Sequence, residues 1–244
     1  MMQCTLFAFD LMQRKITRKS VNPVAPHDVN LVSLGIRVRC FSTFLGQKKE
    51  NVMLRSILLV ILFAFSTAVY ADGFNYNSVT ATYGQIDFDD FDADGDIFGI
   101  DGSFAVSDSF HVFAGYGVGE VDDGISSIDL DEWNIGLGYN TSLSDKIDLV
   151  AGLSYEYIEL SAANQISIDD NGFGVNVGLR MAATDNLEVN AGIAYVDYSD
   201  GGDNTAFGGA VLYNFTETFT LGLSAEFDDD VTAYSVGGRI YFGN

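Results

Sequence analysis

The residues best suited to chemistry form an acidic run between positions 90 and 96. Its aspartates stand at alternate positions: Asp90, Asp92, Asp94 and Asp96. Gly95 permits a sharp turn within the run, and Asp101 stands at the twelfth position counted from Asp90. Alternate carboxylates around such a turn can point at one hard cation, so the run predicts a calcium site. The alternative is a solvated acidic loop tip, because the chain is acidic throughout.

Catalysis by a nucleophile would need a hydroxyl or thiol beside a general base. His111 is the only histidine after residue 71, and its nearest hydroxyls, Ser107 and Ser109, stand in a polar turn. No serine, histidine and acid are therefore set out as a triad. We expect His111 to be a hydrogen-bonding residue inside the fold. We expect no catalytic residue, no enzyme activity and no cofactor other than the calcium considered above.

The first 71 residues differ in kind from the rest of the chain. They hold nine of the 12 lysines and arginines, both prolines and both cysteines. A basic stretch at Met53–Arg55 precedes an apolar run at 57–65 and small residues that end at Ala71, which predicts a signal peptide over 53–71. A membrane-spanning helix is the alternative, but the run 57–70 is shorter than the roughly 20 residues that cross a bilayer.

Residues 1–52 precede this signal peptide, although signal peptides normally stand at the N-terminus of an exported protein. Lys49 and Glu50 can be encoded by a ribosome-binding sequence two codons before Met53. We interpret 1–52 as a non-native upstream extension that results from a misassigned start. We expect export through the Sec pathway and a mature chain that begins at Asp72.

The mature chain, 72–244, is strongly acidic. It keeps three of the 12 basic residues, Lys146, Arg180 and Arg239, and 31 of the 34 acids, so its net charge is −28. This balance excludes nucleic acid as a partner, because phosphate binding needs basic side chains. The mature chain has no cysteine, so it forms no disulfide. Its length suits one domain.

Apolar and polar residues alternate along most of the mature chain, the period that is typical of strands. Four similar segments, at 110–116, 147–153, 187–193 and 219–225, each follow a tight polar turn, and another alternating run precedes each turn. With a first strand near 78–86 and a last one from Val231, the pattern predicts ten strands, with eight as the alternative. The connections are expected to alternate between short turns and longer acidic loops near 88–95, 122–129, 161–170 and 199–204, with a tight last loop at 229–230.

Aromatic residues fall at both ends of these predicted strands. One group lies at the ends near the acidic loops: Trp133, Tyr155, Tyr157, Phe173, Tyr195, Phe207, Phe227 and Tyr234. The other lies at the ends near the short turns: Phe104, Phe110, Tyr139, Tyr213, Phe219 and Phe242. Two aromatic bands are typical of membrane interfaces. We therefore predict an all-β fold, a closed antiparallel up-and-down transmembrane β-barrel over 72–244, with a soluble barrel or sandwich as the alternative.

The last predicted strand, from Val231 to Phe242, carries a recognisable end. The order polar, any, Gly, any, any, apolar, any, apolar is met by Ser235, Gly237, Ile240 and Phe242. It resembles the signal by which the assembly machinery recognises Gram-negative outer-membrane barrels, although two further residues follow the aromatic. Together with the repeated hairpins, it makes the mature chain similar to OmpA/OmpX-like barrels of the outer membrane protein beta-barrel domain family, which typically have eight strands.

This resemblance implies a place in the cell outer membrane. Membrane lipid and lipopolysaccharide would surround the barrel, the barrel-assembly machinery would be its partner during biogenesis, and the protein would be a monomer. Its acidic loops would face outside. Both chain termini would face the periplasm, because the strand number is even.

Inward-facing positions of the predicted barrel are rich in glycine and carry few charges. The glycines either leave a thin aqueous path or relieve crowding where strands bend, and the second reading is favoured. Pairing across the 183–185 turn places Arg180 opposite Glu188, with Asp148 at the same height on the other neighbouring strand. We predict that Asp148, Arg180 and Glu188 form a charge cluster that orders the periplasmic end.

Two functions remain open from the sequence. The first is a structural or surface-interaction barrel whose loops meet other molecules. The second is a narrow, cation-preferring pore for small solutes with an acidic lumen.

Overall fold

The computed structural model describes residues 73–88, 93–122, 127–162, 166–228 and 231–243. The predicted upstream extension, 1–52, and the predicted signal peptide, 53–71, lie outside these residues. All regular structure in the described part is β-strand, and no helix there could cross a bilayer. The strands are β1 (Ser78–Phe88), β2 (Asp94–Ala105), β3 (Phe110–Asp122), β4 (Ser127–Ser144), β5 (Ile147–Ala162), β6 (Ile166–Ala182), β7 (Leu187–Tyr198), β8 (Gly202–Asn214), β9 (Phe219–Phe227) and β10 (Val231–Tyr241).

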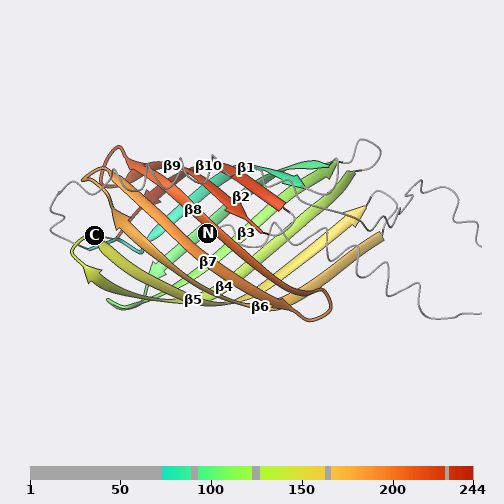
Figure 1. Cartoon of the computed structure of the whole chain (residues 1–244), viewed down its shortest axis with the longest axis horizontal. Coiled ribbons are helices and arrows are strands. Elements are labelled where there is room, and N and C mark those ends of the chain that lie inside the picture. The colour runs from blue at the N-terminus through green and yellow to red at the C-terminus, as the bar shows by residue number, and fades with distance from the viewer. Residues whose placement is uncertain (1–72, 89–92, 123–126, 163–165, 229–230, 244) are drawn as a thin grey trace, which may run out of the picture.

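The ten strands form one closed barrel in which each strand pairs antiparallel with its sequence neighbours (Figure 1). Closure comes from the first and last strands, which pair from Ser78 opposite Tyr241 to Phe88 opposite Val231. The predicted closed up-and-down barrel of ten strands is confirmed, and the alternative of eight is wrong. Both termini of the barrel lie at one end, called here the periplasmic end, and the opposite end is the outer end.

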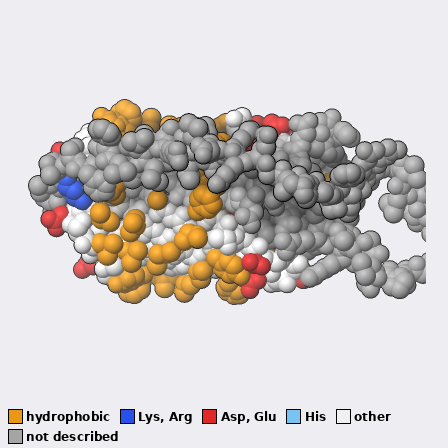
Figure 2. All heavy atoms as spheres, in the orientation of Figure 1, with side chains coloured by type: hydrophobic (Ala, Val, Ile, Leu, Met, Phe, Trp, Pro, Cys, Tyr) orange, Lys and Arg blue, Asp and Glu red, His pale blue; other side chains and the backbone are white. Residues whose placement is uncertain are grey.

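The outside of the barrel is apolar across its middle. Leu153 is 63% exposed and Phe173 is 70% exposed, values that a soluble protein would not give to a whole wall of such residues. On neighbouring strands Leu153 lies opposite Leu137 and Val175, which also face outward. Figure 2 shows apolar side chains gathered along the visible face of the barrel, with acidic side chains beyond them. Such a belt suits the hydrocarbon of a bilayer.

Aromatic rings border this belt and contact one another across strands. Near the outer end, Trp133 stacks on Tyr157 with centroids 5.6 Å apart, and Phe207 stacks on Phe227 at 5.6 Å. Near the periplasmic end, Phe110 lies 5.3 Å from Tyr139. The cross-strand ring contacts agree with the two predicted bands.

The outer connections are shorter than the sequence suggested. Those at 89–93, 123–126, 163–165, 199–201 and 228–230 are no longer than five residues, so the expected alternation of long and short loops is wrong. The strands instead continue into the acidic segments, most clearly where β5 and β6 stay paired as far as Ala162 opposite Ile166. They continue because their inward positions at this end are still apolar, and a ladder persists where one of its faces is buried.

The outer end of the lumen is filled mainly by apolar side chains. Ile158 is fully buried, and Ile86 and Leu130 are each 1% exposed. They belong to a cluster contributed by eight strands and the 89–93 connection: Ile86, Phe88, Ala93, Ile97, Val121, Leu130, Ile158, Leu160, Val196, Tyr198, Ala206, Val231 and Ala233. We call this cluster the outer core. Two buried acids also lie at this level, because Glu132 and Asp170 are directly opposite Ile158.

The apolar belt yields a first prediction. We expect Leu153→Arg to lower the free energy of unfolding in phospholipid vesicles by about 2–4 kcal/mol, the cost of a cation at the bilayer midplane. Asp129→Arg, at an exposed outward position near the outer end, is the matched control, with an expected cost below about 1 kcal/mol. Urea unfolding followed by tryptophan fluorescence measures both, and equal costs would contradict the placement of the belt in the membrane.

Candidate functional site

An ion pair closes the periplasmic end of the lumen. The guanidinium of Arg180 on β6 donates from Nε to Glu188 Oε1 at 2.9 Å and from Nη2 to Oε2 at 3.0 Å. The two side chains are only 13% and 6% exposed, so water screens the pair little. Two parallel bonds between a planar guanidinium and a carboxylate fix the geometry of both groups.

The register that brings this pair together differs from the predicted one. Arg180 lies opposite Asn190, while Glu188 lies opposite Ala182. Five residues, 183–187, separate the last paired residues, two more than assumed, which shifts Glu188 by one inward position. The side chains still meet diagonally, since both face inward and arginine is long.

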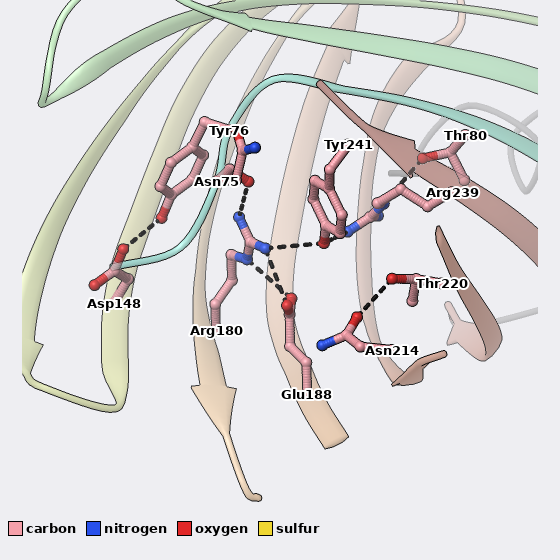
Figure 3. Close-up of polar contacts among 10 residues, drawn as sticks. All are labelled: Asn75, Tyr76, Thr80, Asp148, Arg180, Glu188, Asn214, Thr220, Arg239 and Tyr241. Atoms are coloured by element: carbon pink, nitrogen blue, oxygen red, sulfur yellow. Dashed lines mark hydrogen bonds and ion pairs between the residues drawn. The ribbon is translucent and has the colours of Figure 1, made fainter. Parts of the chain in front are cut away.

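The segment before the first strand completes the closure (Figure 3). The guanidinium of Arg180 lies over the rings of Phe74 and Tyr76, 4.7 Å and 4.8 Å from their centroids. It also donates to the backbone carbonyl of Asn75 at 3.3 Å and to the hydroxyl of Tyr241 at 3.3 Å. Residues 74–76 therefore lie across the periplasmic mouth and use the arginine as their anchor. We call Phe74, Asn75, Tyr76, Arg180, Glu188 and Tyr241 the periplasmic plug.

Asp148 joins this group through a tyrosine rather than through the arginine. It lies directly opposite Arg180 in the β5–β6 register, as the predicted cluster requires. Its carboxylate, however, accepts hydrogen bonds from Tyr76 Oη at 2.8 Å and from Ser142 Oγ at 2.7 Å. The structure thus brings Arg180 and Glu188 together and links Asp148 to them by way of Tyr76. Sequence reasoning missed Tyr76, because no periodic pattern marks a segment outside the strands.

His111 supports the same plug from the side. It is 5% exposed, its Nδ1 lies 3.3 Å from Asn140 Oδ1, and its ring stacks on Tyr76 with centroids 4.9 Å apart. The ring occupies the space above Gly138, where any Cβ would overlap the imidazole. These neighbours place His111 in a packing and hydrogen-bonding role inside the lumen.

The assembly-signal residues divide between the two faces of β10. Ser235 and Gly237 face inward, where the hydroxyl of Ser235 shares a hydrogen bond with Ser224. Ile240 and Phe242 face outward and are 54% and 41% exposed. The backbone amide of Phe242 donates to the carbonyl of Asn77 at 3.1 Å, which ties the end of the chain to the start of the barrel.

Only part of the predicted calcium-binding run lies within the residues that the structure describes. Asp90 and Asp92 lie outside the described residues, whereas Asp94 and Asp96 face outward at the start of β2. Asp96 accepts a hydrogen bond from Tyr83 Oη at 2.7 Å. Among the residues that the structure describes, no three acids, histidines or cysteines are grouped to hold a metal ion.

Outward-facing acids instead form a collar on the outer strand ends. Its members are Asp87, Asp94, Asp96, Glu120, Asp122, Asp129, Asp131, Glu159, Asp169, Asp197 and Asp203. Each lies directly opposite another acid, as in the series Asp131, Glu159 and Asp169 on β4, β5 and β6. Like charges placed opposite one another destabilise a sheet. We call this set the acidic collar.

A chamber of about 320 Å³ lies in the lumen between the periplasmic plug and the outer core. Its floor is formed by Tyr76, Arg180 and Arg239. Arg239 donates to Thr80 Oγ1 at 3.0 Å and to Tyr241 Oη at 3.2 Å. Its wall on β7 to β10 consists largely of glycine and alanine, and the missing side-chain volume leaves the space open.

The plug yields a second prediction. We expect Arg180→Ala to lower the free energy of unfolding by about 3–5 kcal/mol, because Glu188 would remain buried without its partner. Arg180→Lys, the matched control, keeps the charge but cannot make two parallel bonds, so it should fall between that variant and the wild type. Urea unfolding of the refolded barrel measures the change. An Arg180→Ala midpoint equal to that of the wild type would refute the stabilising role of the pair.

Comparison with known proteins places this geometry in a family. The family model described as outer membrane protein beta-barrel domain matches residues 57–215, more than half of the chain. No curated protein matches the chain in sequence.

Solved structures that share the barrel fold have low sequence identity. The translocator domain of the autotransporter NalP from Neisseria meningitidis is 11% identical, with 78% of this chain and 96% of that chain covered and a TM-score of 0.43. Neisserial surface protein A is 14% identical, with 68% and 95% covered and a TM-score of 0.40. The attachment invasion locus protein Ail of Yersinia pestis is 13% identical, with 69% and 99% covered and a TM-score of 0.36. By its family match and its closed barrel of ten strands, the chain belongs to the outer membrane protein beta-barrel domain family.

Proposed function

We propose that this protein is a closed barrel of the cell outer membrane that acts through its outer surface and does not conduct solutes. The observation that carries the proposal is that the lumen is obstructed at both ends. Buried apolar side chains fill the outer end, and the periplasmic plug fills the other. A barrel of ten strands is narrow enough for side chains to fill it in this way.

The outer obstruction is unfavourable for ions in particular. A permeating cation would have to pass the packed apolar side chains of Leu130 and Ile158, which are 1% and 0% exposed. Apolar constrictions of this kind stop ion flow by excluding water. The proposal therefore favours the structural or surface-interaction role over the cation-preferring pore.

An enzymatic role finds no support in the lumen. The imidazole of His111 is occupied by Asn140 and by the stacked ring of Tyr76, neither of which is a nucleophile activated for attack. The proposal includes export through the Sec pathway, after which the mature chain would begin at Asp72.

Single-channel recording in planar bilayers tests the closed lumen. We expect no discrete current steps from the refolded wild-type barrel, because both ends are filled. The positive control is the triple variant Leu130→Gly/Ile158→Gly/Arg180→Ala, which removes side-chain volume from both obstructions. It is expected to produce discrete current steps, which would show that the method detects a pore. Discrete, cation-selective steps from the wild type would overturn the proposal and favour the narrow pore.

The acidic collar suggests which ions and lipids the outer surface binds. Outer-membrane barrels are surrounded on this side by lipopolysaccharide, which is itself anionic, so collar and lipid would repel each other without a counter-ion. Divalent cations that bridge carboxylates and lipid phosphates would relieve both sets of charges. The three basic residues of the mature chain do not serve this purpose, since Arg180 and Arg239 face the lumen and Lys146 lies in a periplasmic turn.

Stability in lipopolysaccharide vesicles tests the collar. Mg²⁺, compared with a chelator, is expected to raise the free energy of unfolding of the wild type by roughly 0.2–1 kcal/mol for each acidic pair that it relieves. Asp131→Asn/Glu159→Gln/Asp169→Asn should lose much of this gain. The matched control removes the same charge from the periplasmic turns and is Asp108→Asn/Asp145→Asn/Asp185→Asn. This control should retain the full Mg²⁺-dependent gain in the free energy of unfolding. Equal Mg²⁺ responses in the two variants would refute a role for the collar.

A further inference from the structure

One carboxylate of the chamber has no basic side chain beside it among the described residues. Glu226 on β9 faces inward between Gly208 of β8 and Ala233 of β10, both too small to cover it. Its Oε1 is inaccessible to water and has no hydrogen-bond partner among the described residues. A buried carboxylate left in this state is costly unless a cation or donor reaches it.

The chamber's own cations are occupied elsewhere. Arg180 is bound by both oxygens of Glu188. Arg239 lies six positions along β10 from Ala233, the residue opposite Glu226, a separation of about 20 Å along the strand. Asp101 also faces the chamber, but it lies at the level of Arg239, because both are opposite Thr80. Of the basic residues that the structure describes, none therefore lies beside Glu226 in the upper part of the chamber, and Glu132 is a further acid that acts on Glu226 there.

The rest of the lining is mainly apolar, with a few unsatisfied polar atoms. Ala206, Ala210 and Ala233 contribute methyl groups to the wall, and Phe113 contributes a ring to the opposite side. Asn190 Oδ1 and Asn176 Nδ2 face the same space and, like Glu226, have no hydrogen-bond partner in the structure. Groups of this kind in a mostly apolar cavity are typical of a small-molecule site.

We propose that the chamber binds a small organic ammonium ion with an apolar body, and that the carboxylate of Glu226 is its counter-ion. The ammonium group would donate hydrogen bonds to Glu226, and the apolar body would lie against the alanine methyls. A cavity of 150 Å³ in another protein holds one benzene molecule, so about 320 Å³ suits a ligand of roughly a dozen non-hydrogen atoms. Entry of the ligand requires residues 74–76 to move aside, because they lie across the periplasmic mouth and are not part of the strand ladder.

The inference rests on the closed lumen of the proposed function, because an open pore would let such an ion pass rather than hold it. The probe is phenethylammonium, added to the refolded full-length mature barrel in lipid nanodiscs. We expect saturable binding and nuclear Overhauser effects between its ring protons and the methyls of Ala206 and Ala233. Its neutral analogue 2-phenylethanol is expected to bind more weakly, since it carries no charge for Glu226.

Three variants locate the site. Glu226→Gln, of the same shape, should weaken binding by roughly 10- to 100-fold, the usual effect of losing a charge-assisted hydrogen bond. Ala210→Leu fills the chamber while leaving Glu226 in place and should also weaken binding. Asp197→Asn removes a carboxylate from the acidic collar and should leave binding unchanged. Folding of each variant is checked by its heat-modifiable mobility on gels.

Several outcomes would overturn the inference. These are the absence of methyl contacts in the wild type, equal affinity for 2-phenylethanol, or binding that is lost equally in Glu226→Gln and Asp197→Asn. The last result would mean that the probe binds acidic groups on the surface. Current steps in the bilayer experiment would instead count against the closed lumen, so failure of the proposed function can be told apart from failure of this inference.

Discussion

Within the hydrocarbon of a bilayer, a backbone amide or carbonyl without a hydrogen-bond partner costs several kcal/mol. The pairing of β1 with β10 meets this constraint, since it converts a ten-stranded sheet with two open edges into a barrel with none. Every other feature depends on that closure. It fixes which side chains face lipid, it creates a lumen, and it brings the first and last residues of the barrel to the same end.

Closure also leaves a space that must be filled, and the protein fills it in three different ways. Apolar side chains occupy the outer third, where they pack as in a soluble core. At the periplasmic end, a guanidinium is surrounded by two aromatic rings, a carboxylate, a carbonyl and a hydroxyl. Between them the side chains become too small to meet, which leaves the chamber. Polar groups are not confined to the plug, since the buried acids Glu132 and Asp170 lie opposite Ile158 in the outer core.

The sequence was sufficient for the strands, for their number and for the face on which each residue lies. Alternation sets the face of a strand, so the inward position of Arg180 and the outward position of Phe242 could be read directly. Arg180 and Glu188 contact each other although the predicted register was wrong by one inward position, because their side chains are long enough to reach diagonally. The outer loops could not be delimited, because Asp131 and Glu159 look like loop residues although they lie on the exposed face of paired strands.

Features that depend on several distant segments could not be predicted. Tyr76 lies between Asp148 and Arg180 because the chain folds back over the barrel mouth, and no periodic pattern records that path. The chamber results from small residues on four neighbouring strands, each of which is unremarkable on its own. The alternation along β9 sets Glu226 to the inward face, but the lack of a basic residue beside it follows only from the positions of Arg180 and Arg239.

The fold-back of residues 74–77 has a kinetic consequence. Asn75 bonds to the carbonyl of Phe242, 167 positions away, and Asn77 accepts a bond from the amide of the same residue. Contacts between such distant parts of a chain carry a large loop-closure cost and form late in folding. The mouth therefore cannot be sealed until the final strand has docked. Because late contacts act mainly on the unfolding rate, the sealed mouth slows the escape of a finished barrel without delaying its assembly.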